Sequence, residues 1–437
     1  MSDRMTRVLI GAYACEPRQG SEPAVGWHWA LEAANAGYDV WVVTRCNNKD
    51  AIEAALTTVA GPRPKFEYLD LPRAFLLLKK HLGYPGLLVY YYLWQVALAM
   101  RARRLHRYLH FDLVHHVTFV NDSLPSGLCL VPVPFVWGPV GGSTHRLPRS
   151  IHLELPIYAR THEMVRGILQ FLLRRLDPFV AFTRHRACVI LTYTHEARAG
   201  IPKAARGRAR AVLHLGVSET EPPPRLAQPA VGREDEFLIL TGGRLVHWKG
   251  YDLLIEGFAA FMRTTPRPFA RLLITGEGRY QRYLEELAAR EGVGEFVEYV
   301  GRLPSREEVF ELMGRCQVFA LPTLRDGPPF ALLEAMAVGV PVMCLDLGAT
   351  GEGIPAEVSL KLPAESRESV VLAIAEALAW TATHPEQAAA LGRKGRRFAL
   401  DHYDWSRLTQ EIRRTYSEAT SFQAVGPASP AAPESAR

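Results

Sequence analysis

The sequence predicts an α/β protein made of two doubly wound units, and three observations lead to this prediction. Its 437 residues are about three times the usual size of one domain, so two domains of roughly 200 residues each are expected. Short β-rich apolar runs alternate with longer helical segments, which is typical of parallel sheets covered on both faces. The alternation stops at a proline-rich stretch, 219–236, and then begins again.

The first unit, residues 1–218, opens with an expected strand at Arg7–Ala12, a helix over Val25–Ala36 and a second strand at Asp39–Thr44. Further strands are predicted at Phe66–Leu69, Leu113–His116, Phe135–Trp137, Val189–Thr192 and Ala211–Leu215. A parallel sheet binds its ligands at the carboxyl ends of its strands, so two such units facing one another would hold a ligand between them.

The second unit, residues 237–400, repeats the alternation. Its predicted strands are Phe237–Leu240, Arg271–Thr275, Phe296–Val300, Val318–Leu321 and Pro341–Leu345, and its predicted helices are Tyr251–Arg263, Tyr280–Arg290, Arg306–Arg315 and Ala331–Val338. Residues 401–421 carry a helix, Trp405–Ser417, that is expected to pack back on the first unit. Residues 422–437 are rich in Pro, Ala and Ser and are predicted to be disordered.

The composition excludes a wholly disordered or fibrous chain, since 48% of the residues are hydrophobic and 22% are charged. The six cysteines are far apart and show no metal-ligand spacing, which predicts reduced thiols and no metal site. The apolar run 8–14 is too short for a signal peptide, so we expect a cytoplasmic protein.

The charge is distributed unevenly along the chain. Residues 1–218 contain 27 Lys and Arg against 15 Asp and Glu, a net charge of +12, whereas residues 219–437 contain 24 against 30, a net charge of −6. A basic first half predicts an anionic partner, and membrane phospholipid, a lipid diphosphate and nucleic acid all satisfy that condition.

The segment Thr241–Gly250, TGGRLVHWKG, follows an expected buried strand and precedes a helix, so it lies at the carboxyl edge of the second sheet. Arg244 and Lys249 place two cations in this loop, and a guanidinium together with an ammonium group suits a diphosphate. The alternative interpretation is a surface turn in which both cations are solvated and bind no ligand.

A second segment, Asp326–Gly339 (DGPPFALLEAMAVG), leads from a strand into a helix. The free N–H groups and the positive dipole end at a helix N-terminus favour phosphate. Glu334 lies a turn inside that helix and suits the hydroxyl pair of a ribose, while Asp326 in the loop could hold sugar hydroxyls. A structural interpretation explains the same spacing equally well. In it, Asp326 starts a turn and Glu334 interacts with the helix dipole.

Together these segments resemble glycosyltransferase family 4, the retaining nucleotide-sugar enzymes with the GT-B fold. Gly243, Arg244 and Lys249 match the family's GR-x-x-x-x-K stretch, and Asp326 and Glu334 have the spacing of its two acids. The AMA-x-G-x-P run at 335–341, TGEG at 275–278 and GRLP at 301–304 also match. The resemblance implies two facing Rossmann-like domains with the active site between them, and transfer of a hexosyl group with retention.

The resemblance also implies roles for individual residues. Arg244 and Lys249 would clamp the donor diphosphate, Glu334 would bind the nucleotide ribose and Asp326 would contact the transferred sugar. The donor-binding residues implied are Gly20, Ser21, Gly243, Arg244, Lys249, Phe330, Ala331, Leu332 and Glu334, and the catalytic ones are Arg244, Lys249, Asp326, Glu334 and His116.

The chain departs from the family pattern around its first acid. Asp326 stands where the family usually has Glu and is one methylene shorter, which changes its reach to the sugar. The family uses backbone N–H groups two to four positions after this acid, but Pro328 and Pro329 have none. Phe330 and its successors are therefore the expected donors, and the identity of the sugar does not carry over.

Three features of the first unit are expected to face the same cleft. Gly20 and Ser21 lie where the family places a glycine-rich loop beneath the donor phosphate. His115 and His116 end a strand, where the family has a histidine pair, and we favour His116 for the cleft with His115 as the alternative. The run FVWGPVGG at 135–142 resembles an acceptor-side loop of polysaccharide-building members.

The resemblance implies a reaction in which the departing diphosphate helps to deprotonate the acceptor on the front face of the sugar. Electrostatic stabilisation of that leaving group is then the main task of the site. Two cations perform this task, so we expect neither a metal nor another cofactor.

Residues 76–107 combine an apolar stretch with aromatic residues and flanking Lys and Arg. The apolar part, 86–100, would be about 22 Å long as a helix and is too short to span a bilayer core of ~30 Å. It suits a helix lying on an anionic membrane, which would place the protein peripherally at the inner face of the plasma membrane with a lipid-linked acceptor. A long helix packed within the first unit explains the same pattern.

The leading hypothesis is therefore a glycosyltransferase that acts on an envelope polysaccharide or a lipid-linked acceptor. Glycosylation of a small molecule, a GT-B phosphorylase and an epimerase are the enzymatic alternatives. An NAD-binding protein would need G-x-G-x-x-G, which Gly242 and Gly243 do not form. Nucleic acid is not expected as a partner, because the aromatic residues cluster with aliphatic ones instead of forming stacking platforms.

Overall fold

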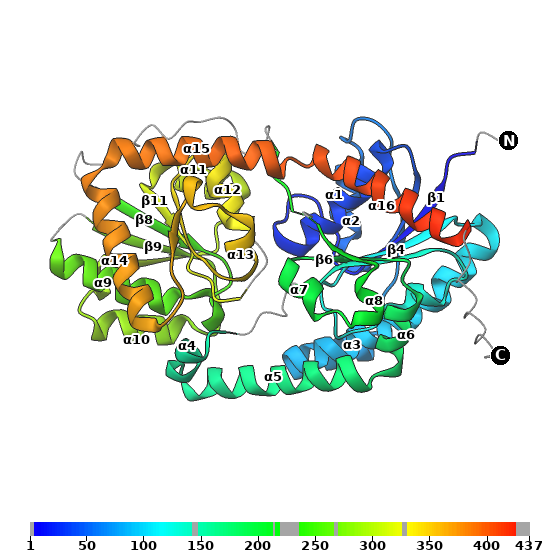
Figure 1. The fold of residues 1–437 in the computed structure, drawn as a ribbon, viewed down its shortest axis with the longest axis horizontal. Helices are drawn as coiled ribbons and strands as arrows, with labels where there is room; N and C mark the ends of the chain where they lie inside the picture. Colours follow the sequence, from blue (N-terminus) through cyan, green and yellow to red (C-terminus); the bar gives the residue numbers. More distant parts are fainter. Residues whose placement is uncertain are drawn as a thin grey trace, which may run out of the picture.

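The computed structural model describes residues 4–141, 147–212, 215–218, 236–265, 270–325 and 330–424. Two parallel sheets lie side by side, and helices cover both faces of each sheet (Figure 1). We refer to the part built around the first sheet as the first domain and to the part built around the second sheet as the second domain. The predicted architecture of two doubly wound units is confirmed.

The first sheet has the strand order β3-β2-β1-β4-β5-β6-β7, and all its pairings are parallel. Its strands are β1 (Arg7–Ala12), β2 (Asp39–Thr44), β3 (Lys65–Tyr68), β4 (Leu113–Thr118), β5 (Phe135–Val140), β6 (Val189–Thr192) and β7 (Ala209–Ala211). The chain winds outward from β1 and then returns to place β4 beside it, so the topological switch point lies between β1 and β4.

The second sheet has the order β10-β9-β8-β11-β12-β13 and is also parallel throughout. Its strands are β8 (Phe237–Gly242), β9 (Ala270–Thr275), β10 (Val297–Gly301), β11 (Val318–Ala320), β12 (Val342–Leu345) and β13 (Leu360–Leu362). Its switch point lies between β8 and β11. Ligands of open parallel sheets bind at the carboxyl ends of the strands beside such a point.

The helices cover the sheets because their apolar residues are buried against the strands. In the first domain they are α1 (Ser21–Asn35), η1 (Cys46–Asn48), α2 (Lys49–Leu56), α3 (Arg73–Leu109), η2 (Gly127–Leu130), α4 (Arg149–Glu154), α5 (Ile157–Leu176), α6 (Pro178–Arg186), α7 (His195–Gly200) and α8 (Lys203–Arg206). The second part of the chain adds η3 (His247–Lys249), α9 (Tyr251–Thr264), α10 (Gln281–Arg290), η4 (Gly294–Phe296), α11 (Arg306–Arg315), α12 (Phe330–Val338), α13 (Gly348–Gly353), η5 (Ala356–Val358), α14 (Arg367–Thr383), α15 (Pro385–Tyr403) and α16 (Ser406–Ala424).

Helix α16 leaves the second domain and lies on the first (Figure 1). The Tyr416 hydroxyl is 2.9 Å from Nδ1 of His115, and Thr409 donates to Glu32 in α1. The helix continues to Ala424, past residue 422, where the tail was predicted to begin. Most of the predicted linker, 219–235, and the remaining tail, 425–437, lie outside the described residues.

Two segments that cross between the domains meet beside Trp405. Val217 forms a parallel bridge with Asp404, and the Val217 amide donates to the Tyr403 carbonyl at 2.7 Å. A Cβ atom on Gly216 would lie 2.4 Å from the Trp405 ring, so this crossing requires glycine there. The indole also stacks on His28 of α1, with the ring centres 4.0 Å apart.

Helix α5 joins the two domains along the opposite side, where it runs beneath both of them in Figure 1. Just before it, the Ser150 hydroxyl donates to the Glu365 carbonyl of the second domain at 2.7 Å. Near its start, the Tyr158 ring lies 6.4 Å from the ring of Tyr280 in the second domain. The first domain therefore reaches under the second by way of α4 and α5.

Helix α3 separates the two interpretations of residues 76–107. Tyr90, Tyr91 and Trp94 are buried in the core of the first domain because α3 packs there against η2 and the sheet, as the alternative of a packed helix requires. Its earlier part, before a kink at Gly83, leaves Leu77, Leu78 and Leu82 exposed. None of the described helices is long and apolar enough to cross a membrane.

The crossing at Trp405 gives a first prediction. Gly216→Ala should lower the free energy of unfolding by roughly 1–3 kcal/mol, because the added methyl group overpacks against the indole. Gly207→Ala is the matched control, since a Cβ there would meet no described atom within 4 Å and its backbone is already helical. Denaturant unfolding of both variants tests this, and equal stability would contradict the packing.

Candidate active site between the two sheets

The loops at the two switch points approach each other across the space between the sheets. A Cβ atom on Gly20, which follows β1, would lie 3.8 Å from Nη1 of Arg306 and 3.9 Å from Oε1 of Glu334 in the second domain. The structure thus brings the predicted Gly20 and Ser21 loop to the predicted acid of the second domain, although these residues are more than 300 positions apart in the sequence.

The loop after β8 is held in place by glycines and backbone hydrogen bonds. A Cβ at Gly250 would lie 2.0 Å from the Pro322 carbonyl oxygen, and one at Gly276 would lie 2.1 Å from the carbonyl oxygen of Gly243. These close approaches explain the glycines of the KG and TGEG motifs. Arg244, which follows Gly243, is exposed, and its guanidinium lies 5.9 Å from the centre of the Trp248 ring.

Glu334 lies in α12, where Nη2 of Arg306 approaches its Oε1 to 2.8 Å. Phe330 begins that helix, and its ring centre is 6.1 Å from the Trp405 ring. Leu332 is fully buried. Asp326 and the two prolines after it lie outside the described residues.

Both strand-end histidines lie below the protein surface. Nε2 of His115 is 2.8 Å from the Gly138 carbonyl, on the face of the sheet that α16 covers. His116 faces α3 instead, is 1% exposed, and has its Nε2 3.5 Å from the Tyr91 hydroxyl. The expected opening of one histidine to the cleft is not observed, because β4 is central and helices cover both of its faces. The catalytic role of His116 stays a prediction.

Burial lowers the pKa of both histidines, to about 3 for His115 and to about 4 for His116. Nearby carbonyl oxygens oppose this shift at both residues, while the neighbouring His116 adds to it at His115. Both imidazoles are therefore neutral at pH 7. Among the described residues, Nδ1 of His116 has no hydrogen-bond partner.

Glu22 is a carboxylate at the site that the sequence interpretation passed over. Its Oε1 accepts a hydrogen bond from the Val120 amide at 2.8 Å, and this joins the two loops at the switch point of the first sheet. Burial raises the pKa of Glu22, although the Val120 amide and the charge of Arg244 oppose the shift. In the sequence, Glu22 is an ordinary acid in the first turn of a helix.

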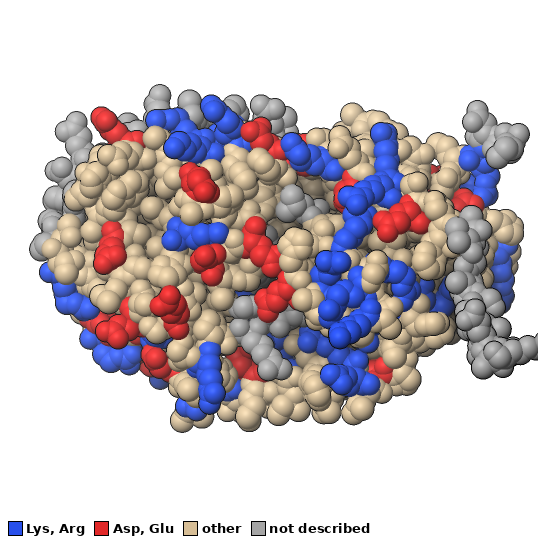
Figure 2. All heavy atoms as spheres, in the orientation of Figure 1, with Lys and Arg blue, Asp and Glu red and all other residues tan. Residues whose placement is uncertain are grey.

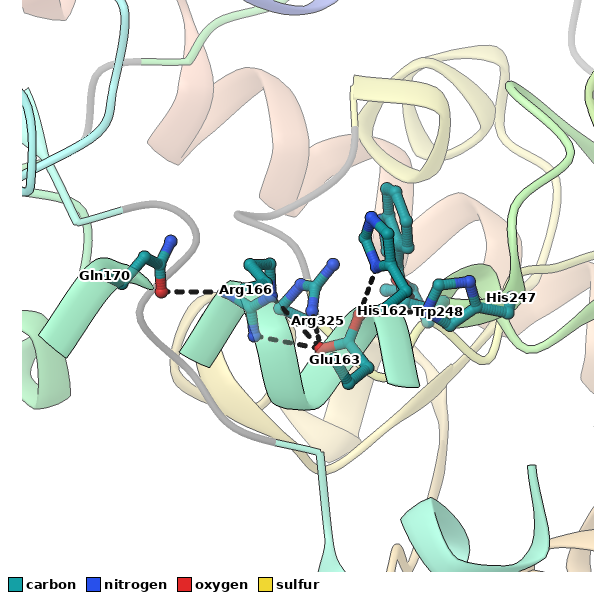
Figure 3. Close-up of polar contacts among 8 residues, drawn as sticks. His162, Glu163, Arg166, Gln170, His247, Trp248 and Arg325 are labelled. Carbon is teal, nitrogen blue, oxygen red and sulfur yellow. Dashed lines mark hydrogen bonds and ion pairs between the residues drawn. The ribbon is translucent and has the colours of Figure 1, made fainter. Parts of the chain in front are cut away.

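A second missed residue, Glu163, joins the domains through α5 (Figure 3). Its Oε1 is 2.9 Å from Nε2 of His247 in the GGRLVHWKG loop, and its Oε2 pairs with Arg325, the residue before Asp326. Arg166, one turn along α5, donates to Oε2 at 3.0 and 3.1 Å. No sequence motif predicts this cluster, because its residues are spread over 162 positions of the sequence.

The electrostatics of the Glu163 cluster are dominated by cationic neighbours. Burial alone would raise the pKa of Glu163, yet hydrogen bonds from His162 and His247 and the charges of Arg325 and Arg166 hold it far below its usual range. His162, Glu163 and His247 have atoms close enough to share a metal ion. Two guanidinium groups already neutralise the carboxylate, so this set fits a cation poorly.

The family of the second domain follows from comparison with known sequences. Residues 225–398 match the family model described as glycosyl transferases group 1. The second domain is a group 1 glycosyltransferase domain. The match covers the loop with Arg244 and Lys249 and the helix with Glu334. The resemblance to glycosyltransferase family 4 is thereby confirmed.

Two curated relatives extend this assignment. A GDP-mannose-dependent alpha-(1-6)-phosphatidylinositol monomannoside mannosyltransferase of Mycolicibacterium smegmatis is 30% identical over 182 residues, covering 40% of this chain and 46% of the relative. A GDP-mannose-dependent monoacylated alpha-(1-6)-phosphatidylinositol monomannoside mannosyltransferase of Corynebacterium glutamicum is 26% identical over 283 residues, covering 63% and 65%. The chain thus spans between about half and two thirds of the length of these relatives.

A solved structure confirms the GT-B fold of this chain. A sucrose-phosphate synthase from Thermosynechococcus elongatus superposes with a TM-score of 0.65 and 18% identity, covering 96% of this chain and all of that one. The likeness includes both domains.

The Glu163 cluster makes a pH-dependent prediction. Because the folded pKa of Glu163 is depressed, its ionised form stabilises the fold above the unfolded pKa of about 4.3, and this contribution is lost as the pH falls toward the folded value. Glu163→Gln should cost roughly 3 kcal/mol of unfolding free energy at pH 7, since it removes the buried negative charge that pairs with Arg166 and Arg325.

The difference from wild type should shrink as the pH falls below about 4, which denaturant unfolding at several pH values would measure. Glu154→Gln, an exposed acid in α4, is the matched control and should change stability little at any pH. A deficit of constant size across the pH range would contradict the assigned ionisation of Glu163.

Proposed function

We propose that this chain is a glycosyltransferase that transfers a hexosyl group from a nucleoside diphosphate sugar to an envelope polysaccharide or a lipid-linked acceptor, with retention of configuration. The observation that carries the proposal is the convergence of the Gly20 loop with Arg306 and Glu334 across the cleft. The proposal is supported because the loop implied to bind phosphate and the acid implied to bind ribose approach each other from the two domains.

The chemistry of the two switch points supports a diphosphate leaving group. Arg244 and Lys249 belong to one loop beside the start of α9, and Arg244 is exposed toward solvent. A nucleoside diphosphate departs with growing negative charge, which positioned cations stabilise in the transition state. Glu334 would accept hydrogen bonds from the ribose hydroxyls while Arg306 holds its carboxylate in place.

The donor and the mechanism rest on likeness to relatives. Both curated relatives are named for their use of GDP-mannose, which makes it the first donor to test. Retention by front-face substitution follows from the family 4 resemblance. In that scheme Glu22, whose pKa is raised by burial and lowered by the nearby charge of Arg244, would hold an acceptor or sugar hydroxyl.

The acceptor is proposed to be amphiphilic because apolar side chains are exposed on the underside of the first domain. The first turns of α3 expose Leu77, Leu78 and Leu82, and α5 exposes an apolar series in which Ile157 is 80% exposed. The exposed apolar residues of α5 are Ile157, Tyr158, Met164, Val165, Ile168, Leu169, Phe171, Leu172 and Leu176. Arginines interrupt this series, as they do in helices that lie on anionic membranes.

The donor site is tested by two substitutions and a control. Arg244→Ala and Glu334→Gln should each reduce transfer at least 100-fold, because each removes a contact to the donor. Arg282→Ala, a fully surface residue of α10, should keep wild-type turnover. The assay measures transfer from GDP-mannose and other nucleotide sugars, and wild-type turnover by either donor-site variant would refute the assignment.

The membrane contact is tested by vesicle binding. The double variant Ile157→Glu/Ile168→Glu should bind anionic phospholipid vesicles at least tenfold more weakly than wild type, because it removes exposed apolar area and adds negative charge. Leu372→Glu is the matched control, since Leu372 is exposed on α14 of the second domain. Equal retention of the α5 variant, or an equal loss in the control, would contradict a membrane role for α5.

A further inference from the structure

A pocket of about 220 Å³ lies in the first domain, away from the cleft motifs. Its walls come from the middle and end of α5, from α6, and from the turn at 200–202 between α7 and α8. Lys and Arg side chains form a band over this domain, across α7 and α8 (Figure 2). No sequence motif pointed to the pocket, because its walls come from separate helices.

Arginine dominates the lining of the pocket. Arg166, Arg174, Arg175 and Arg184 all line it, and Asp122 is the one acid among its described lining residues. Arg166 pairs with Glu163 and Arg174 pairs with Asp122, so the excess positive charge of the pocket comes from Arg175 and Arg184. Pockets of this composition recognise phosphate groups, because the guanidinium fork matches the geometry of two phosphate oxygens.

Ion pairs within the pocket do not neutralise all of its arginine side chains. Asp122 is committed to Arg174, which donates to its Oδ1 at 2.6 and 3.0 Å. Arg175 and Arg184 form no ion pair with a carboxylate within the described part of the chain. Nε of Arg184 is buried and has no hydrogen-bond partner among the described residues. A buried donor without a partner is costly, and a bound anion would remove that cost.

The charge on Arg184 is itself disfavoured in the described structure. Burial lowers its pKa, and Arg174 lowers it further, while Asp122 opposes both. An arginine stays charged in proteins, so this direction reports an electrostatic cost and not a neutral side chain. A phosphate group in the pocket would relieve the repulsion between Arg174 and Arg184.

The surroundings of the pocket point to an amphiphile. Phe171 lines it and is half exposed, with Arg175 lying over its ring at 5.5 Å, and Ile168 and Leu172 are exposed beside it on α5. An anionic head in the pocket would therefore continue into an apolar part along α5. This combination of arginines and exposed apolar side chains matches a lipid phosphate better than a free sugar phosphate.

The pocket also connects to the candidate active site. Arg166 lines the pocket, donates to Gln170 at 2.9 Å, and donates to Glu163, which in turn contacts His247 and Arg325 (Figure 3). From Glu163 to Arg174 the helix rises about 16 Å at 1.5 Å per residue. This distance leaves room for an acceptor sugar between a phosphate in the pocket and the donor.

We propose that the arginine pocket formed by α5, α6 and the 200–202 turn binds the phosphate or diphosphate group of an amphiphilic acceptor. That the bound molecule is the acceptor of the reaction rests on the proposed function. The binding of its phosphate group depends only on the pocket. The pocket is separate from the loop of Arg244 and Lys249, which is assigned to the donor.

Calorimetric binding of octyl phosphate to the full chain, without any nucleotide sugar, tests the pocket. The double variant Arg175→Gln/Arg184→Gln should bind octyl phosphate at least tenfold more weakly than wild type. The matched control, Arg103→Gln/Arg104→Gln, removes two exposed arginines of α3 and should bind as wild type does. An unchanged affinity in the pocket variant, or an equal loss in the control, would overturn the proposal.

A second variant tests the pocket even if the double arginine variant does not fold. Gly200→Glu adds a carboxylate at the rim, where a Cβ meets no described atom within 4 Å, and should abolish binding. Gly207→Glu adds the same charge outside the lining and should retain binding. Binding that survives Gly200→Glu would count against the pocket.

Further ligands and one further variant identify the source of the phosphate. Octyl phosphate binding more tightly than inorganic phosphate supports a lipid phosphate, and equal affinities would overturn the amphiphilic part of the proposal. Octyl glucoside, which has no charge, should not bind, and binding of equal strength would overturn the phosphate part. Arg244→Ala should keep full octyl phosphate affinity even though it loses transfer, so failure of the donor site and failure of the pocket are distinguishable.

Discussion

One buried carboxylate, Glu163, links the two domains of this protein. It extends from α5 of the first domain to His247 and Arg325, and those residues belong to the two loops at the switch point of the second sheet. A carboxylate that is 5% exposed must have its charge compensated, and here the partners come from both domains. The position of α5 and the geometry of the loops after β8 and β11 therefore depend on one another.

The direction of the parallel strands determines how the loops between the domains are arranged. Parallel sheets direct the carboxyl ends of their strands, and the loops that follow them, to one edge. With two such sheets facing each other, Gly20 of the first domain meets Arg306 and Glu334 of the second. Trp405 and α16 secure the arrangement on one side, and α5 secures it on the other. A diphosphate bound at this edge would contact both domains.

Positive charge has two separate uses in the proposed reaction. Arg244 and Lys249 serve a leaving group in the cleft, whereas the arginines around the α5–α6 pocket serve a group that stays on the acceptor. The excess of basic residues in the first half of the chain is thus partly explained by a defined cavity. Helix α5 combines these features, because it lines the pocket, carries exposed apolar side chains and contacts the loop after β8.

The sequence by itself determined the two-unit α/β fold and the loops that carry Gly20, Arg244 and Glu334, because hydrophobic periodicity and motif spacing are local properties. It left open whether Tyr90, Tyr91 and Trp94 face a membrane or the core, and it did not reveal that His116 is buried, since burial of a side chain depends on what packs against it from elsewhere in the chain. Only the tertiary structure decided that Glu163 meets Arg325 and that four arginines surround one cavity. Those groups lie on separate helices and loops, and no periodicity relates residues that only folding brings together.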